Sequence, residues 1–129
     1  MAEEEIPVGF ARQIMLLSGI ALLAGTYLAI SPLISGYTFS SGLTSLNVAL
    51  GAGIVILAYF RATIGQAAAW LAWANVGLGV LTLVTPWTTN YAFLDVFRSQ
   101  HLVVGGIVVG CETLGALLTH LYLARRAAV

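Results

Sequence analysis

Long apolar runs dominate the chain, and charged residues interrupt them at only a few points. No Asp, Glu, Lys or Arg lies between Arg12 and Arg61, and none lies between Arg61 and Asp95. A helix needs about 20 apolar residues to cross a hydrocarbon core of about 30 Å. The first run is therefore long enough for two crossings and a turn, and the second for one crossing. A fourth run, over 102–124, contains Glu112 as its one charged residue.

These runs predict four membrane-spanning helices. Unpaired backbone groups are too costly in lipid for open sheets, so spanning segments are either helices or strands of a closed barrel. The runs are continuous rather than alternating and are too few for a barrel, which favours helices. Pro32 and Pro86 are expected to end the first and third helices, because proline disfavours helix in the residue before it. We predict an all-α, integral membrane four-helix bundle with helices at 13–30, 43–60, 67–84 and 102–124.

The connections carry further expectations. The link from Arg61 to Gln66 is short, so the second and third helices should be antiparallel neighbours. The segment 88–100 places aromatic side chains among polar and charged ones. This mixture favours a short helix lying in the membrane interface, or alternatively a docking surface for a partner.

Composition supports this assignment. The 129 residues are 60% hydrophobic and 8% charged, with a net charge of zero, whereas soluble domains carry roughly 25% charged residues. A water-soluble globule, a nucleic-acid binder and a disordered chain are therefore excluded. We expect membrane lipid as a partner and no nucleic acid.

The arginines predict an orientation. Four crossings place both tails, 1–12 and 125–129, and the middle link on one side of the membrane. Four of the five arginines belong to that side: Arg12, Arg61, Arg125 and Arg126. The other side holds Arg98. The positive-inside rule therefore places both termini in the cytoplasm.

The chain also matches itself at an offset of 54 residues. Five identities mark corresponding helix ends, connections and following helices: Gly25 and Gly79, Pro32 and Pro86, Tyr37 and Tyr91, Phe39 and Phe93, Gly51 and Gly105. Asn47 falls on His101. The units 13–62 and 67–116 each hold two helices, so both run in the same direction. We predict a parallel repeat about an axis near the membrane normal.

Each unit ends its first helix with a hydroxyl residue, a proline and a bulky apolar residue. These are Ser31-Pro32-Leu33 and Thr85-Pro86-Trp87. The pattern resembles the SPW-repeat family, small bacterial and archaeal membrane proteins named for a Ser-Pro-Trp motif. The first copy lacks the tryptophan and the second has Thr for Ser. The resemblance covers about 13–116 and implies four helices in two pairs, in the inner (plasma) membrane of a prokaryote.

The motif has a structural interpretation. The proline should end the helix at the outer interface, and the hydroxyl of Ser31 or Thr85 can satisfy a carbonyl that the proline frees. Trp87 would anchor its helix end in the headgroup layer. We interpret the motif as a folding device rather than an active site.

Glu112 is the main candidate for chemistry, because it lies near the bilayer midplane, where a lipid-facing carboxylate is costly. It must be protonated, paired or turned inward. It can serve as a proton or cation site, or as a neutral acid that hydrogen-bonds across a helix interface. Asn75, Thr82 and Thr26 are possible partners within the bundle. Its counterpart in the other repeat is Ala58.

Other cofactor sites have little support. His101 and His120 are 19 residues apart on one helix, or about 28 Å at 1.5 Å per residue. They cannot ligate one haem together, although His120 alone could ligate a pigment. The alternative is that His120 lies solvated at the helix end. We expect no metal and no cofactor beyond a bound lipid or pigment. The single cysteine, Cys111, is interpreted as a small buried hydrophobe.

Small residues at helical spacing indicate close helix packing. Gly106 and Gly110 form a G-x-x-x-G pair, and Gly25 and Gly53 each follow an alanine by four residues. Such spacing lets helix backbones approach within the bundle or against another protein.

Three functions remain open. The chain contains no C-x-x-C, H-E-x-x-H, P-loop or G-x-S-x-G motif, so we expect no enzyme. The first hypothesis is an accessory or structural subunit that packs against a larger membrane complex or against its own copies. The second is a small oligomeric proton or ion transporter or channel that uses Glu112. The third is a pigment- or cofactor-binding subunit that uses His120.

Overall fold

A computed structural model describes residues 7–35, 41–90, 93 and 95–128. Four helices account for nearly all of these residues: α1 (Val8–Ser35), α2 (Ser41–Thr63), α3 (Ala69–Thr88) and α4 (Asp95–Ala127). All four are long and apolar enough to cross a membrane. The fold is therefore an all-α bundle of a multi-pass membrane protein, as predicted. The matched residues Tyr37, Phe39 and Tyr91 lie outside the described residues.

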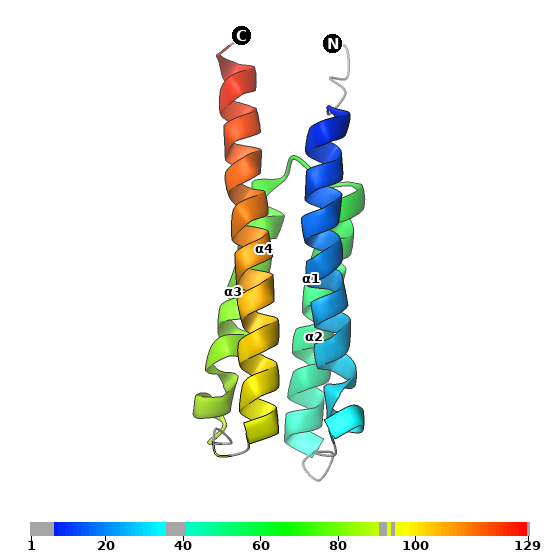
Figure 1. Cartoon of the computed structure of the whole chain (residues 1–129), viewed down its shortest axis with the longest axis vertical. Coiled ribbons are helices and arrows are strands. Elements are labelled where there is room, and N and C mark those ends of the chain that lie inside the picture. Colours follow the sequence, from blue (N-terminus) through cyan, green and yellow to red (C-terminus); the bar gives the residue numbers. More distant parts are fainter. Residues whose placement is uncertain (1–6, 36–40, 91–92, 94, 129) are drawn as a thin grey trace.

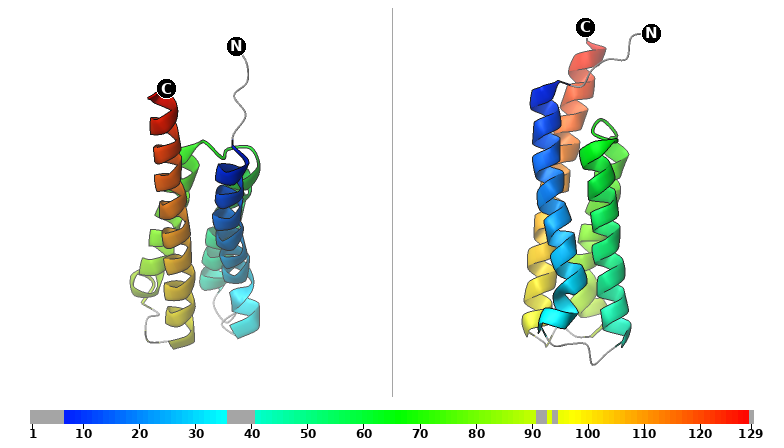
Figure 2. Two further views of the ribbon diagram at one scale, coloured as in Figure 1. Left: turned by 45° about the horizontal axis from the view of Figure 1, so that its top comes forward. Right: turned by 90° about the vertical axis from the view of Figure 1, so that its right-hand side faces the viewer.

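The four helices form a ring in which each packs against two neighbours. α1 packs against α2 and α4, and α3 packs against α2 and α4. Consecutive helices run in opposite directions, so both termini lie at one end of the bundle (Figure 1). The views of Figure 2 show the same arrangement from two further sides. The expected antiparallel contact of α2 with α3 is confirmed, and α2 and α4 lie across the bundle from each other.

The core is small and the outside is apolar. Buried apolar side chains from three helices form one cluster: Ala21, Ala24, Leu28, Leu50, Ile54, Ala58, Val104 and Val108. Large apolar side chains also cover the outer faces of all four helices, among them Leu23, Ile56, Leu81 and Leu117. A helix that is apolar all round is typical of a membrane span. Lipid contact follows directly from this surface.

The observed helices are longer than the predicted ones, and α1 and α4 each exceed the prediction by ten residues. α4 begins at Asp95 instead of 102, so the separate interfacial helix expected in 88–100 is wrong. The reason is that Phe97 and Gln100 are buried in the bundle, which makes it favourable to continue α4 by two turns. Asp95 and Arg98 pair on its exposed side at 2.8 Å.

Both prolines lie inside helices, so the expectation that they end α1 and α3 is also wrong. α1 continues three residues past Pro32, and α3 continues two residues past Pro86. In a helix a proline leaves the carbonyl four residues earlier without its amide donor. The Ser31 hydroxyl donates to that carbonyl, Leu28 O, at 2.7 Å. This confirms the role expected for Ser31, whereas Thr85 donates to Leu81 O instead.

Glycines bring the paired helices together at two equivalent points. A methyl group on Gly51 of α2 would lie 2.5 Å from the Gly25 carbonyl oxygen of α1. A methyl group on Gly105 of α4 would lie 2.9 Å from the Gly79 carbonyl oxygen of α3. Gly25 and Gly79 are 54 residues apart, as are Gly51 and Gly105, so the two contacts involve residues that coincide in the sequence match. Only glycine permits this close approach of the backbones.

The other glycines chosen from the sequence divide into two kinds. A methyl group on Gly53 would meet Leu78 of α3 at 3.1 Å, so Gly53 lies inside the bundle contacts. Gly106 and Gly110 would meet nothing within 4 Å. Their G-x-x-x-G face therefore points away from the bundle.

The glycine contact gives a stability prediction. Gly51→Ala should lower the unfolding free energy by about 1–3 kcal/mol, the usual cost of overpacking. Gly106→Ala is the matched control, and it should be neutral or slightly stabilising because alanine is the better helix former. Thermal unfolding followed by circular dichroism in one detergent measures both. Equal midpoints for the two variants would contradict the close contact.

Candidate functional site

The interior of the bundle holds an unusual number of polar side chains. Among the residues that the structure describes, eleven are at most 8% exposed: Ser18, Ser31, Asn47, Arg61, Asn75, Thr82, Thr85, Gln100, His101, Glu112 and Thr119. Lipid offers no hydrogen bonds, so groups of this kind must bind one another or the backbone. They gather at three levels of the bundle: the middle, the end with the termini and the opposite end.

Glu112 occupies the middle level and faces inward from α4. Its side chain is 2% exposed. Asn75 of α3 donates from Nδ2 to Glu112 Oε1 at 3.2 Å and to the Ile54 carbonyl of α2 at 3.3 Å. Of the three partners considered from the sequence, Asn75 is therefore the one that binds Glu112. Thr82 and Thr26 each donate to a carbonyl of their own helix.

Two features of this level are asymmetric. The positions 54 residues before Asn75 and Glu112 are Ala21 and Ala58, which are fully buried and belong to the apolar cluster. The polar pair therefore lies on one side of the interior only. Asn75 Oδ1 is buried and has no hydrogen-bond partner, so this level has an acceptor to spare beside the acid.

Arg61 holds the level next to the termini. It is 1% exposed, and its guanidinium donates to two carbonyls of the α2–α3 link, Gly65 O at 3.0 Å and Gln66 O. It also donates across the bundle to Gly115 O at 3.1 Å and to the Thr119 hydroxyl. These bonds join α2, the link and α4 at one point.

Arg61 is a buried polar residue that the sequence analysis did not single out as part of a site. The sequence analysis used Arg61 only to predict the orientation in the membrane, because a charged side chain next to a link between helices is ordinarily solvated. A buried position could be suspected only from the glycine 54 residues later, Gly115, which leaves space for a long side chain. Arg61 and Glu112 are both buried inside the bundle, and within the part of the chain that the structure describes no ion pair joins them.

The opposite level joins three helices through two matched residues. Asn47 of α2 donates from Nδ2 to Ser31 Oγ of α1 at 3.2 Å. Its Oδ1 lies 2.9 Å from Nε2 of His101, which is fully buried on α4. His101 Nδ1 lies 2.8 Å from the Phe97 carbonyl oxygen. The two residues that coincide in the sequence match therefore meet inside the bundle.

Apolar side chains separate two of these levels along α4. Val104 and Val108 stand between His101 and Glu112 on α4, and both are buried in the apolar cluster. Within the described residues, the polar groups therefore form separate clusters rather than one path across the membrane. What they can do chemically is hold helices in register and bind a proton locally.

His120 has a different setting on the outside of the bundle. Its Nε2 accepts a hydrogen bond from the Trp73 indole at 3.1 Å. A pigment metal would have to displace this bond to reach Nε2. Within the described ranges, no group of three His, Cys, Asp or Glu side chains could hold a metal ion.

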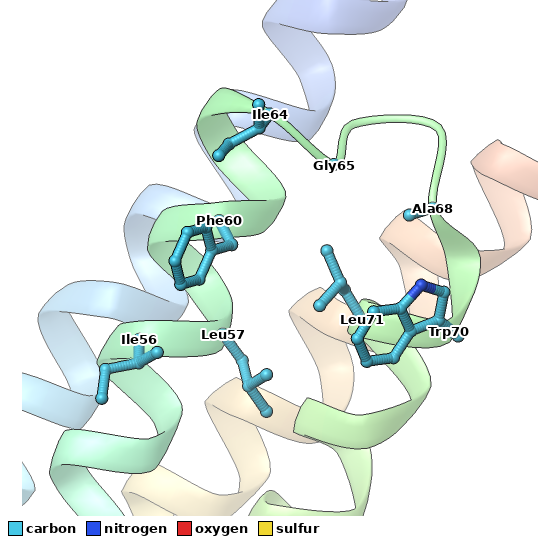
Figure 3. A pocket seen from close by; sticks show the side chains of 8 residues that line it. All are labelled: Ile56, Leu57, Phe60, Ile64, Gly65, Ala68, Trp70 and Leu71. Carbon is cyan, nitrogen blue, oxygen red and sulfur yellow. The ribbon is translucent and has the colours of Figure 1, made fainter.

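An apolar groove of about 480 Å³ opens between α2 and α3, close to their link (Figure 3). Its lining consists of Ile56, Leu57, Phe60, Ile64, Gly65, Ala68, Trp70 and Leu71. A smaller groove of about 350 Å³ lies between α1 and α4, with Tyr27 at its edge. Both grooves offer apolar contacts and little else.

The comparison with known families agrees with this architecture. The SPW repeat domain family matches residues 15–115 of the chain. The chain belongs to the SPW repeat family. No curated protein and no solved structure matches it. The resemblance noted from the two proline motifs is thereby confirmed.

The SPW motif has an inner and an outer part in this structure. Ser31 and Pro32 are buried at the end of α1, and so are Thr85 and Pro86 at the end of α3. The third motif residues face outward, Leu33 with 76% and Trp87 with 53% of the side chain exposed. The motif therefore places a hydroxyl inside the bundle and an apolar side chain against the lipid.

The buried side chains of Arg61 and Glu112 give a testable prediction. Arg61→Met should cost roughly 3–5 kcal/mol, because it leaves buried acceptors such as Gly65 O and Gly115 O without a donor, at about 1–3 kcal/mol each. Glu112→Gln should cost less in the Arg61→Met background than in the wild type, with a coupling of about 0.5–3 kcal/mol. Equilibrium unfolding in mixed micelles measures the cycle.

Arg98→Met provides the control for this cycle. Arg98 pairs with Asp95 on the surface, where such pairs contribute about 0–1 kcal/mol. Additive costs for Arg61→Met and Glu112→Gln would show that the two charges do not sense each other.

Proposed function

We propose that this SPW repeat protein is an accessory or structural membrane subunit rather than an enzyme. It packs against other membrane-protein subunits, either a larger complex or copies of itself. The proposal needs no catalytic group and no nucleic-acid partner. It requires an outer surface that another helix can approach closely.

The observation that carries the proposal is the outward face of α4. Gly106 and Gly110 lie one turn apart on it, with open space where a side chain would stand. Val103 and Leu114 are exposed on the same helix. Small residues flanked by branched ones allow a partner helix to pack at backbone distance, which drives association in lipid.

The hydrogen bonds inside the bundle also support the proposal of a structural subunit. Glu112, Asn75, Arg61, Asn47 and His101 all make hydrogen bonds within the chain. These bonds fix the register of the helices and present a rigid surface. A rigid surface loses little entropy when it associates.

Our proposal includes a topology. We infer two parallel repeats, 13–62 and 67–116, in a prokaryotic plasma membrane with both termini in the cytoplasm. The glycine contacts recur at the offset of the repeats. Arg12, Arg125 and Arg126 are exposed at the end of the termini, and Arg98 lies at the other end. That distribution agrees with the positive-inside rule.

The association is testable by blocking the α4 face. Gly106→Leu and Gly110→Leu should abolish recovery of a native complex or oligomer, because each adds a side chain where a backbone must approach. Gly77→Leu on α3 is the matched control, since Gly77 also meets nothing within 4 Å. Blue-native electrophoresis and identification of co-purifying subunits measure the result. Unchanged assembly in both α4 variants would exclude this face.

A second candidate function is proton or ion transport through Glu112. The buried and unpartnered Asn75 Oδ1 favours it, because this acceptor stands ready beside the acid. Because Val104 and Val108 separate Glu112 from His101 along α4, this candidate requires a path between copies of the chain. Pigment binding has less support, because His120 Nε2 already accepts a bond from Trp73.

Transport predicts a specific effect of Glu112→Gln. The glutamine keeps a hydrogen bond to Asn75 but cannot exchange a proton, so proton flux into liposomes should fall at least tenfold. Empty liposomes and Thr26→Val, a change on the exposed side of α1, serve as controls. If wild-type liposomes are no more permeable than empty ones, the transport candidate is rejected and the accessory role is unaffected.

A further inference from the structure

Both ring nitrogens of His101 face oxygen atoms. Nδ1 lies 2.8 Å from the Phe97 carbonyl oxygen, and Nε2 lies 2.9 Å from Asn47 Oδ1. A carbonyl oxygen can only accept. A neutral imidazole has one N–H, so it can donate to one of these oxygens and not to both. With the Asn47 carboxamide in this orientation, both contacts are hydrogen bonds only when the imidazole carries a proton on each nitrogen.

The hydrogen bonds beyond Asn47 also fit a protonated His101. Asn47 Nδ2 donates to Ser31 Oγ at 3.2 Å, and Ser31 Oγ donates to the Leu28 carbonyl at 2.7 Å. Leu28 O receives no backbone hydrogen bond from Pro32, because proline has no amide N–H. With an imidazolium, four bonds therefore run in sequence from Phe97 O through His101, Asn47 and Ser31 to Leu28 O.

A neutral His101 requires a different arrangement of the same atoms. A half-turn of the Asn47 carboxamide exchanges Nδ2 and Oδ1 and leaves the heavy-atom distances in place. Asn47 then donates to His101 Nε2, and Ser31 turns its hydroxyl hydrogen toward Asn47 Oδ1. Leu28 O loses its hydrogen bond from Ser31. The series of hydrogen bonds from Phe97 O to Leu28 O, called the relay below, then has three bonds instead of four.

We propose that His101 is a buried proton-binding site at the end of the bundle away from the termini. Proton binding turns the Asn47 carboxamide and restores the Ser31 bond to Leu28 O. The ligand is a proton from that side of the membrane. The consequence is a firmer α1 end at Pro32, so the SPW motif becomes part of a proton-sensitive joint between α1, α2 and α4.

Among the described residues, the other charged or titratable side chains near this relay bind groups outside it. On α4 the nearest charged residues are Asp95 and Arg98, which bind each other on the exposed side. On α1 the titratable group is Tyr27, which accepts from Gln100 at 3.0 Å. The described buried residues of α3 at this level, Thr85 and Pro86, carry no charge. Glu112 is eleven residues further along α4, or about 16 Å.

The experiment uses the full chain with one histidine. His120→Gln removes the only other histidine from the outside of the bundle. Nitrogen NMR of the ¹⁵N-labelled protein in nanodiscs then follows one imidazole between about pH 4.5 and 8. We expect both ring nitrogens to reach imidazolium shifts on acidification, and the Asn47 side-chain amide signals to move with the same midpoint. Circular dichroism checks that the helices stay intact.

Two serine variants separate the relay from a plain buried histidine. Ser31→Ala removes the bond that protonation restores, so the midpoint should fall by roughly half to one pH unit, the equivalent of one hydrogen bond. Ser18→Ala is the matched control, because Ser18 is also buried on α1 but is outside the relay. Its midpoint should not move.

Three results would overturn the proposal. One is a His101 imidazole whose nitrogen shifts stay constant while the protein is folded. Another is a titration that leaves the Asn47 amide signals unchanged. The last is an equal shift of midpoint in Ser31→Ala and Ser18→Ala. The Asn47 signals in the His120→Gln protein decide the matter even if Ser31→Ala does not fold.

Discussion

A polar group inside a lipid-embedded bundle has to find its partner within the protein, and this constraint organises the structure. α2 and α4 lie across the ring from each other, yet polar side chains connect them at both ends. Asn47 meets His101 at one end, and Arg61 reaches Gly115 and Thr119 at the other. Between these two connections lie branched apolar side chains such as Ile54 and Val108, together with the hydrogen-bonded pair Asn75 and Glu112. The polar pairs specify register, because sliding one helix by a single turn would leave each of them unsatisfied.

Apolar burial alone cannot specify this fold, because the outside of the bundle is as apolar as the inside. Close glycine contacts and buried hydrogen bonds therefore distinguish the inner faces from the outer ones. Gly25 and Gly51 bring α1 against α2, and Gly79 and Gly105 repeat the contact for α3 and α4. The outward pair Gly106 and Gly110 has the same chemistry with no neighbour in the chain. Some glycine pairs thus lie in helix contacts within the bundle, whereas Gly106 and Gly110 face outward, where a partner helix could pack in the proposed role as a subunit.

Residues that match at the offset of 54 positions differ in size and polarity inside the bundle. At several buried positions one unit keeps a small or apolar residue while the other carries a polar one, as with Ala58 and Glu112 or Gly115 and Arg61. A small residue in one half provides the space that a long or charged residue in the other half needs. Arg61 lies against the backbone of its own counterpart, Gly115. These differences between matched positions make the polar interior of the bundle asymmetric.

The sequence by itself determined the number of helices, their membrane location, the SPW family and the candidacy of Glu112 with Asn75. These follow from local quantities, namely the length of apolar runs, the spacing of charges and a recurring proline motif. The tertiary structure decided that Pro32 and Pro86 stay inside their helices and that α4 begins at Asp95. It also decided that Arg61 is buried and that Asn47 meets His101. The physical reason is that each of these outcomes depends on a partner 16 or more residues away in the chain, or on the interior space that the packed helices leave, and a one-dimensional pattern contains neither.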